Sequence, residues 1–386
     1  MILYYLVNVR IPSERAHCVQ IVNMCSAFKK QGIEIELIVP FRFQTSRMAA
    51  VKDVFSYFGV EKFKIKRLPT IDFFIFYRFK YLSFLNFSRV NTLFFWLTAL
   101  IYLSFKKRGW IFVRQEDLAF LFSLTKSKII YEVHRLPESF MFFYKILLRR
   151  ASKIIVLNKT IKEALINNGN IFEHKILVAS SGASEVDFLN YKTNRAVQCV
   201  DIDHQKINVL YAGSVSKDRG IEFIIESFKY LNQRYVLYIL GGTASQIIQF
   251  KHLVKQLNVY HRVLFMGYTD YINTQKFLRL ADILVVCYDK NGNHVPRSPL
   301  KIFEYLAAGK PMVAPNLPFI AEILTHGKNA ILVEPNNSLA IARAITNISE
   351  NKDLAETLKY YSKLTAKQYI WKTRVNNIIE FVNSNQ

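Results

Sequence analysis

The stretch Ser298-Pro-Leu-Lys-Ile-Phe-Glu-Tyr-Leu-Ala-Ala-Gly-Lys-Pro311, followed by the apolar Met312-Val-Ala-Pro315, predicts one short helix that leads into a buried strand. Ser298 can cap the helix, Pro299 suits its first position because no backbone donor is lost there, and Gly309 with Pro311 ends it. The N-terminus of a helix offers unpaired N–H groups and a positive dipole end. We therefore expect this helix, through the amides near Leu300, to face a phosphate oxygen.

Two charged residues of this helix, Lys301 and Glu304, are three positions apart and share one face. A carboxylate at that place can accept hydrogen bonds from sugar hydroxyls. The same spacing also suits an exposed salt pair between the two side chains. Spacing alone leaves both interpretations open.

Outward from this stretch, short apolar runs alternate with helical patterns along the whole chain. At 386 residues the chain can form two domains, each with its own core. The alternation is typical of doubly wound parallel sheets. Strands are predicted at 2–7, 33–40, 110–114, 128–133, 153–157, 175–179, 207–212, 235–240, 263–266, 283–288 and 329–333. We place the first domain at 1–190, a linker at 191–206, the second domain at 207–368 and a last helix at 369–386.

Glycine-bearing loops follow three strands of the second domain. Gly213-Ser214 opens a loop that contains Lys217 and Arg219 and leads into a helix, and a glycine loop of this kind is a weak phosphate signal by itself. Arg219 can fork onto two phosphate oxygens. Gly241-Gly242 and Gly267-Tyr268 end the next two strands, where glycine permits close backbone approach.

The residues Ser298 to Lys301, Phe303 to Tyr305, Ala308 to Pro311 and Glu322 closely resemble the donor-site signature of retaining GT-B glycosyltransferases of the bacterial group 1, or GT4-like, class. The resemblance implies an α/β fold of two Rossmann-like domains that face each other across a cleft. It implies that Glu304 holds the ribose of a nucleotide-sugar, and that the two glycine loops after Gly241 and Gly267 approach base and ribose. A second family glutamate is replaced here by Pro296.

The same resemblance assigns further roles. In the family, two cations bind the donor diphosphate. Ser214 replaces the first of them here, and Arg219 stands at the position of the second. Arg219, with Lys217 and Lys301, is therefore expected to bind the diphosphate. The histidine after Tyr-Glu-x, His134, is expected to face the transferred sugar. Acceptor contacts are expected in the loop after the first strand. The predicted catalytic residues are His134, Arg219, Lys301 and Glu304. The donor-binding set is Gly213, Ser214, Lys217, Arg219, Gly241, Gly242, Tyr268, Ser298, Pro299, Leu300, Lys301 and Glu304, and the acceptor set is Ser13, Arg15 and His17.

Net charge and motif content indicate which partners and cofactors the chain can bind. The net charge is +23, of which residues 1–200 carry +16, so an anionic membrane surface, a nucleic acid or a phosphorylated substrate is attracted. No nucleic-acid motif accompanies the charge. The four cysteines, Cys18, Cys25, Cys199 and Cys287, lack metal-ligand spacing and indicate a reducing cytoplasm. No Asp-x-Asp falls where a metal is needed, because Asp201-Ile-Asp203 lies in the expected linker, so we expect no cofactor and no metal.

The N-terminal segment Met1–Val7 runs into a strand pattern without the sections of a signal peptide, and no secretion is expected. The stretch 71–108 is unusually aromatic. Its apolar piece, Leu93–Phe105, is thirteen residues long, whereas a membrane span needs about twenty. It can be a core helix, or an interfacial helix whose basic flanks meet anionic lipid.

We therefore expect a retaining, metal-independent glycosyltransferase at the inner face of the cytoplasmic membrane, which moves a sugar from a nucleotide-sugar to a polyprenyl-diphosphate-linked saccharide in polysaccharide, O-antigen or capsule assembly. One alternative is a nucleotide-sugar epimerase or hydrolase of the same fold. Another, from a different class, is a basic nucleic-acid-binding protein.

Overall fold

The computed structural model describes residues 1–70, 87–137, 142–184, 202–290 and 299–384. It divides into two units: Met1–Ser180 with Trp371–Gln386, and Ser181–Ile370. The chain thus leaves the first unit after Ser180 and returns to it at Trp371. Most of the predicted linker lies outside the described residues.

The first unit is a seven-stranded parallel sheet with strand order β3-β2-β1-β4-β5-β6-β7. Its strands are β1 (Ile2–Leu6), β2 (Glu34–Pro40), β3 (Lys64–Leu68), β4 (Trp110–Val113), β5 (Lys128–Val133), β6 (Lys153–Val156) and β7 (Ile176–Val178). Its helices are α1 (Ala16–Lys30), α2 (Ser46–Ala49), α3 (Val54–Phe58), α4 (Phe87–Ser104), α5 (Glu116–Ser123), α6 (Phe142–Arg150), α7 (Lys159–Asn167) and α15 (Trp371–Asn383).

The second unit is a six-stranded parallel sheet with strand order β10-β9-β8-β11-β12-β13. Its strands are β8 (Ile207–Ala212), β9 (Tyr235–Leu240), β10 (Val263–Gly267), β11 (Ile283–Val285), β12 (Met312–Pro315) and β13 (Ile331–Val333). Its helices are α8 (Ile221–Ser227), α9 (Ala244–Gln256), α10 (Tyr271–Leu280), α11 (Leu300–Ala308), α12 (Pro318–Ala321), α13 (Ser338–Glu350) and α14 (Lys352–Ala366).

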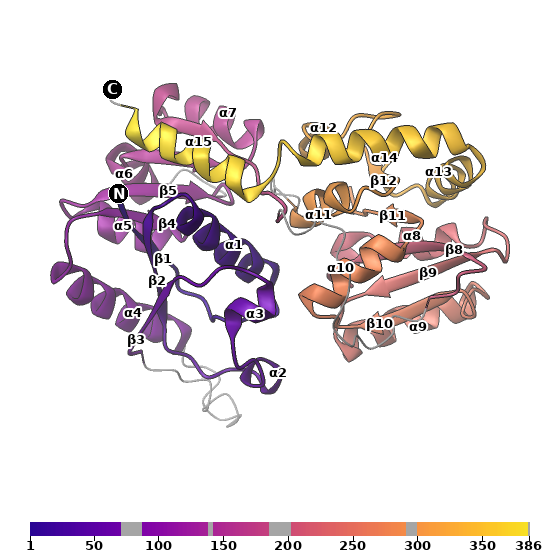
Figure 1. Cartoon of the computed structure of the whole chain (residues 1–386), viewed down its shortest axis with the longest axis horizontal. Coiled ribbons are helices and arrows are strands. Elements are labelled where there is room, and N and C mark those ends of the chain that lie inside the picture. Colours follow the sequence, from indigo (N-terminus) through magenta and orange to yellow (C-terminus); the bar gives the residue numbers. More distant parts are fainter. Residues whose placement is uncertain (71–86, 138–141, 185–201, 291–298, 385–386) are drawn as a thin grey trace. The chain divides into compact units, whose positions relative to one another are not determined.

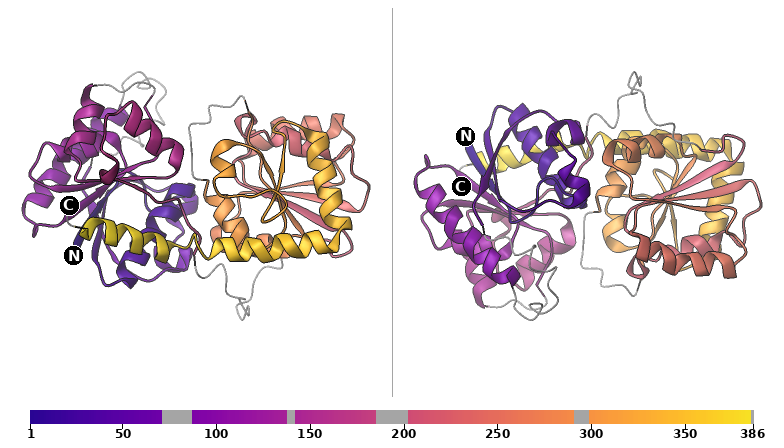
Figure 2. Two further views of the ribbon diagram at one scale, coloured as in Figure 1. Left: turned by 90° about the horizontal axis from the view of Figure 1, so that it is seen from above. Right: turned by 90° about the horizontal axis from the view of Figure 1, so that it is seen from below.

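Helices cover both faces of each sheet (Figures 1 and 2). In the second unit, Val209 and Tyr211 of β8 pack with α8, α9 and α13, whereas Leu210 and Ala212 pack with α10, α11 and α12. Parallel strands that are buried on both faces read as continuous apolar runs, which is why the sequence located them well. The prediction of an α/β fold with two doubly wound parallel sheets is confirmed.

Both strand orders reverse direction beside the first strand of the unit, at β1/β4 and at β8/β11. Open α/β sheets bind ligands at this switch point, outside the carboxyl ends of the strands. We therefore expect ligand-binding residues in the loops after β1 and β4 in the first unit and after β8 and β11 in the second.

Helix α11 begins one residue later than predicted. Its first helical residue is Leu300, and Pro299 occupies the N-cap position with an extended backbone (φ −73°, ψ 115°). The placing of Pro299 at the first helical position was therefore wrong by one residue, and Ser298 lies outside the described residues. At the other end Gly309 is left-handed (φ 63°) and ends the helix as predicted.

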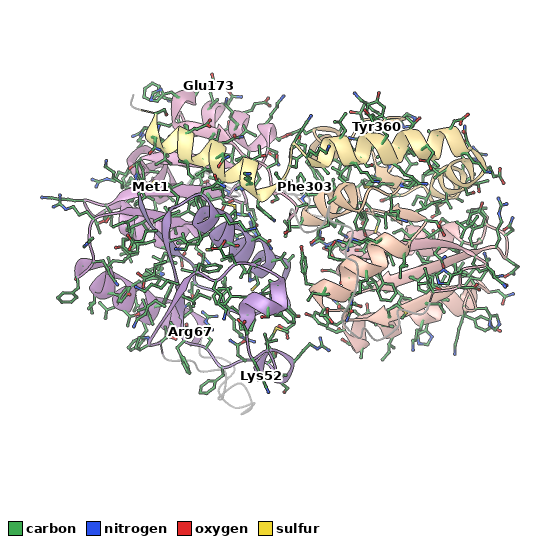
Figure 3. All side chains as sticks on the ribbon, viewed as in Figure 1. Met1, Lys52, Arg67, Glu173, Phe303 and Tyr360 are labelled. Atoms are coloured by element: carbon green, nitrogen blue, oxygen red, sulfur yellow. The ribbon has the colours of Figure 1, made fainter. Side chains whose placement is uncertain are left out.

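Helix α11 has a buried face and a polar face. Phe303 (labelled in Figure 3) is fully buried with Ile302, Tyr305 and Leu306. Lys301 and Glu304, between these residues on the other face, are partly exposed. The buried face anchors the helix in the core, so that Lys301 and Glu304 are held in fixed positions.

One strand of the first unit was not predicted from sequence, and one predicted helix is longer than expected. Strand β3 carries Lys64, Lys66 and Arg67 and forms a charged edge of the sheet, so it lacked the apolar run used to find the other strands. The apolar piece Leu93–Phe105 lies, except for Phe105, in the 18-residue helix α4 (Phe87–Ser104), which is longer than the predicted piece. Among the helices in the described residues, none combines the length and apolar character that a membrane span needs.

The close approach of two strand ends generates a stability prediction. Gly241 has φ +109°, and a Cβ added there would lie 2.1 Å from the carbonyl oxygen of Gly213. Gly267 has φ +68°, but its added Cβ would meet nothing within 4 Å. We expect Gly267→Ala to lower the unfolding free energy by about 1 kcal/mol through backbone strain, and Gly241→Ala to lower it by about 3 kcal/mol through strain and overlap together. Urea unfolding of both variants measures the difference, and equal losses would contradict the role of the close approach.

Candidate functional site: a buried lysine and a charged pocket

The second unit holds an ammonium group without a hydrogen-bond partner among the described residues. Among the described residues, Nζ of Lys301 has no hydrogen-bond acceptor and is shielded from solvent, although part of the side-chain stem is exposed. It lies over the ring of Tyr211, 4.1 Å from the ring centroid. Burial lowers the pKa of Lys301 to about 8, assisted by Arg219 and opposed by Cys287 and Glu304. A buried cation without an acceptor costs free energy, so this site is prepared for an anion.

The loop after β8 is built around this ammonium. Gly213 has φ +150°, and a Cβ added there would lie 2.6 Å from Nζ of Lys301. The hydroxyl of Tyr305 accepts a hydrogen bond from the backbone N–H of Ala212 at 2.7 Å. The hydroxyl of Tyr211 donates to the carbonyl oxygen of Ser214 at 2.7 Å. The two tyrosines thus fix the backbone on either side of Gly213, where only glycine leaves room for the lysine.

A second cation reaches the same place from the short 3₁₀ helix Lys217–Arg219. The guanidinium of Arg219 lies 5.5 Å from the ring centroid of Tyr288, which also faces Nζ of Lys301 at 5.8 Å. The Arg219 guanidinium is 3.7 Å from the Asp218 carboxylate, and both Asp218 and Lys217 are exposed. Lys301 and Arg219 therefore form a pair of cations beside the switch point.

The remaining predicted donor residues lie on neighbouring strand ends. The N–H of Gly213 donates to the carbonyl of Leu240, and that of Gly241 donates to the carbonyl of Gly267 at 2.6 Å. These bonds place the ends of β8, β9 and β10 in a row. A Cβ on Gly242 would lie 2.8 Å from Val215. Tyr268 follows Gly267 in this row, at the far end from Lys301.

Glu304 lies one turn along α11 from Lys301. Its carboxylate raises the pKa of Lys301, although burial has the larger and opposite effect. Because Nζ of Lys301 is buried and has no hydrogen-bond partner among the described residues, the alternative of an exposed Lys301–Glu304 salt pair does not describe this helix.

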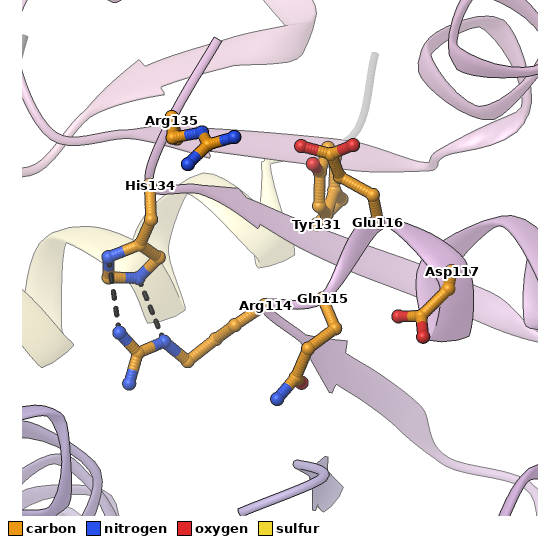
Figure 4. A pocket seen from close by; sticks show the side chains of 7 residues that line it. All are labelled: Arg114, Gln115, Glu116, Asp117, Tyr131, His134 and Arg135. Atoms are coloured by element: carbon orange, nitrogen blue, oxygen red, sulfur yellow. Dashed lines mark hydrogen bonds between the residues drawn. The ribbon is translucent and has the colours of Figure 1, made fainter. Parts of the chain in front are cut away.

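The first unit holds a pocket of about 410 Å³ at the carboxyl ends of β4 and β5 (Figure 4). Burial raises the pKa of Glu116, assisted by Asp117 and opposed by Arg135. The pocket thus has acidic groups on one side and basic groups on the other, which suits a ligand rich in hydroxyl groups. Its lining residues are Arg114, Gln115, Glu116, Asp117, Tyr131, His134 and Arg135.

Four polar side chains form a closed ring beside this pocket. Arg114 Nε donates to His134 Nε2 at 2.9 Å, and Arg114 Nη2 donates to Gln20 Oε1 at 3.2 Å (Figure 4 shows the first pair). Gln20 Nε2 donates to Glu132 Oε1 at 3.2 Å, and Glu132 Oε2 lies 3.2 Å from His134 Nε2. Burial lowers the pKa of His134 to about 4, with Arg114 assisting and Glu132 opposing. The imidazole is therefore neutral at pH 7.

The predicted acceptor residues lie near this hydrogen-bonded ring of side chains. Burial lowers the pKa of His17 to about 4, and Arg114, Arg15 and His134 add to the effect, so that His17 belongs to the same cluster. Arg15 is exposed at the N-cap of α1. Ser13 is buried, and its hydroxyl oxygen accepts the N–H of Arg15 at 3.3 Å.

Several residues of both sites escaped the sequence analysis. Tyr211, Tyr288 and Tyr305 read as core aromatics, and their hydroxyl bonds and ring contacts with cations depend on the tertiary structure. Glu132 is a carboxylate inside an apolar strand, which is a signal that could have been used. Arg114 ends the neighbouring strand, and Gln20 looks like an ordinary helical residue. Among the described residues, no cluster of three or more metal-ligating side chains is present.

Comparison with known proteins finds a family model that matches part of the chain. Residues 194–365 match the family described as glycosyl transferases group 1. A glycosyltransferase of Methanocaldococcus jannaschii is 25% identical over 232 residues, which are 57% of this chain and 56% of that protein. The O-antigen chain mannosyltransferase RfbU of Salmonella typhimurium is 23% identical over 232 residues, 58% of this chain and 60% of that protein. The chain thus spans less than two thirds of the length of these curated relatives.

Solved structures share the whole fold. Anabaena HepE in complex with UDP superposes with a TM-score of 0.72 at 12% identity and covers 100% of both chains. Sucrose-phosphate synthase of Thermosynechococcus elongatus superposes with a TM-score of 0.75 at 15% identity and covers 99% of this chain and 98% of that one. At these identities the likeness extends to the fold, which is that of two-domain glycosyltransferases.

The buried Lys301 predicts a pH dependence of stability. Its folded pKa of about 8 is below the unfolded value of 10.5, so the unfolded state binds more protons between these two pH values. The unfolding free energy of the wild type should therefore rise relative to that of Lys301→Met as pH increases from about 8, by as much as about 1.4 kcal/mol per pH unit. Below pH 8 the difference between the two should be constant.

Denaturant unfolding at pH 7, 8, 9 and 10 measures this difference. The exposed Lys255, replaced by Met, supplies the background for removing a surface charge. A wild type whose stability relative to Lys301→Met shows no slope above pH 8 would mean that the ammonium is not buried.

Proposed function

We propose that the chain is a group 1 glycosyltransferase that transfers a sugar from a nucleoside-diphosphate sugar to a saccharide acceptor in polysaccharide or glycan assembly; the match of residues 194–365 to that family supports this. The observation that carries this proposal is the ammonium of Lys301 beside Gly213, which has no hydrogen-bond partner among the described residues. A diphosphate is the part of such a donor that supplies the missing anion.

The chemistry follows from the charges around the leaving group. Negative charge grows on the diphosphate as the glycosidic bond of the donor breaks, and preorganised cations at that position lower the barrier. Lys301 and Arg219 are such cations, and the N-terminus of α11 adds a positive dipole end. We propose retaining transfer that needs no metal, with Glu304 holding the ribose and His134 facing the transferred sugar.

The nucleotide is proposed to occupy the row of strand ends formed by Gly213, Gly241, Gly242, Gly267 and Tyr268. Glycine at these places permits the approach of a base and ribose to the backbone. A solved structure with this fold, that of HepE, is a complex with UDP, which supports a nucleoside diphosphate as the class of ligand. The acceptor saccharide is proposed to enter the pocket at His134, whose volume lies within the range of small-ligand pockets, about 300–1,000 Å³.

We further propose that the acceptor is lipid-linked and that α4 rests on an anionic membrane surface at the cytoplasmic face. The buried side of α4 carries Phe95 and Ala99. Its other side is an apolar stripe that is 39–59% exposed and is continued by Phe105, which is 86% exposed. The members of the α4 stripe are Val90, Leu93, Phe94, Leu97, Ile101 and Phe105.

Basic residues border the α4 stripe. Lys64 and Lys66 are exposed on the adjacent edge strand β3, where Lys66 lies 5.4 Å from the ring of Tyr102 on α4. Lys107 and Arg108 follow the helix and are exposed. An apolar helix face bordered by cations is complementary to anionic head groups and the acyl boundary beneath them. The core interpretation of this helix fits the side with Phe95 and Ala99, and the interfacial interpretation is the one proposed for the α4 stripe.

The donor proposal predicts selective losses of nucleotide affinity. Lys301→Met should weaken binding of UDP or GDP, whichever the wild type prefers, by about 10- to 100-fold, because a charge-assisted contact to the diphosphate is lost. It should leave the affinity for the nucleoside almost unchanged. Glu304→Ala should weaken diphosphate and nucleoside alike, since it acts at the ribose.

Calorimetric titration and thermal shift measure these affinities, with Lys255→Met as the matched control. If no nucleoside diphosphate or nucleotide-sugar stabilises the wild type at millimolar concentration, the donor proposal is wrong. Release of free sugar or of an epimer without acceptor would identify the same-fold hydrolase or epimerase instead.

The membrane proposal predicts a loss of vesicle binding. Leu97→Ser/Ile101→Ser should reduce binding to vesicles of phosphatidylglycerol and phosphatidylcholine at least roughly tenfold, because two apolar side chains no longer enter the acyl boundary. The matched control, Ile248→Ser/Ile272→Ser, alters two exposed isoleucines of the second unit and should bind as the wild type does. Co-sedimentation measures the partition, and equal binding by all three proteins would contradict the role of α4.

A further inference from the structure

The returning helix α15 carries one arginine into the core of the first unit. Arg374 is 4% exposed and lies on the buried face of the helix with Trp371, Val375 and Ile378. α15 packs against α1, the helix that carries Gln20 of the polar ring. The sequence places Arg374 more than two hundred positions from Glu132 of that ring.

The guanidinium of Arg374 makes contacts in two directions. Nη2 donates to Oε1 of Glu132, whose carboxylate is wholly buried. Nη1 donates to the carbonyl oxygens of Ala179 at 2.6 Å and Ser180 at 3.0 Å, and Nε points to the sulfur of Met24 at 3.3 Å. Ser180 is the last residue before the chain leaves this unit. Arg374 therefore joins the departing chain, the returning helix and the carboxylate beside His134.

The carboxylate of Glu132 links Arg374 to the imidazole. Its Oε1 accepts from both Arg374 and Gln20, and its Oε2 lies 3.2 Å from His134 Nε2. If Oε1 lost its bond to Arg374, the carboxylate could rotate and Oε2 would leave its place opposite the ring. The ion pair thus fixes the only carboxylate that contacts His134 among the described residues.

The charges in this cluster also depend on Arg374. The groups that face His134 are Arg114 from β4, Glu132 from β5, His17 from α1 and Arg374 from α15. With two arginines, one carboxylate and neutral histidines, the cluster has a net charge of +1. Arg374 therefore neutralises Glu132 and discourages proton uptake by the imidazole.

We propose that Arg374 is a positioning residue for sugar transfer, which holds His134 at the pocket through Glu132. This inference rests on the proposed function for its effect on the reaction, but the contact with His134 can be tested without any reaction. Arg374 contacts no part of the predicted donor site, since its partners among the described residues all belong to the first unit.

The test compares Arg374→Gln with Arg374→Lys and with the double variant Glu132→Gln/Arg374→Gln. The double variant removes both charges, so it leaves no buried ion alone and keeps the test valid if Arg374→Gln fails to fold. Arg234→Gln is the matched control, because it breaks an exposed ion pair with Glu350 (2.6 Å) in the second unit.

The first readout is the titration of His134 by NMR, assigned by the signal that disappears in His134→Asn. In Arg374→Gln we expect the pKa of His134 to rise by roughly one unit or more, because a nearby cation is gone and the charge of Glu132 is no longer compensated by Arg374. Arg374→Lys keeps the charge and should titrate close to the wild type. A folded Arg374→Gln whose His134 titrates as in the wild type would overturn the proposal.

The second readout separates transfer from donor binding. Arg374→Gln and the double variant should lower kcat for sugar transfer about 10- to 100-fold, whereas the Kd for the nucleoside diphosphate should stay within about twofold. A folded double variant with wild-type kcat would also overturn the proposal. If the wild type itself transfers no sugar from any nucleotide-sugar, the proposed function fails, and the His134 titration still decides whether Arg374 acts on the imidazole.

Discussion

The constraint on which the second unit depends is the burial of the Lys301 ammonium, which has no acceptor in the part of the chain that the structure describes. Removing a cation from water costs several kcal/mol unless a partner compensates it. Here the surroundings only lessen the cost: the Tyr211 ring faces Nζ, and the Cys287 and Glu304 side chains favour the charged form. The strand end at Gly213, the two tyrosine hydroxyls and the position of α11 together maintain a deficit of negative charge. A bound anion is therefore stabilised by a cation that already lost its hydration when the protein folded.

The first unit shows the opposite arrangement. Glu132 is also wholly buried, but Arg374 and Gln20 bind its carboxylate and Arg114 lies 3.8 Å away. Burial opposes ionisation, but His134, Arg374 and Arg114 together hold the pKa of Glu132 well below the usual range. This network is saturated and stabilises a unique arrangement of the strand ends around His134. One unit thus leaves a charge uncompensated for a ligand, and the other uses paired charges to fix a neutral imidazole.

The sequence predicted the elements whose signal is local. Strands buried on both faces, the left-handed Gly309 and the helix of Lys301 and Glu304 could all be recognised from neighbouring residues. Strand β3 could not, because its exposed lysines break the apolar run. The residues around His134 were missed for a different reason. Gln20, Arg114, Glu132 and Arg374 come from separate parts of the chain, and only the packing of helices α1 and α15 on the sheet brings them together. Likewise, the local pattern of α4 does not reveal that Phe95 faces the core and Leu97 the solvent.

Helix α11 combines the polar site with the hydrophobic core in only nine residues. Ile302, Phe303, Tyr305 and Leu306 are buried, and the residues between them carry the charges. A substitution in α11 therefore affects either the core or the polar site, and most substitutions in this helix are expected to be harmful. The end of β10 is less constrained, since an added Cβ at Gly267 meets nothing, whereas one at Gly241, after β9, would overlap the backbone of Gly213. Engineering of a new nucleotide preference should thus begin in the loop after β10 and leave the helix intact.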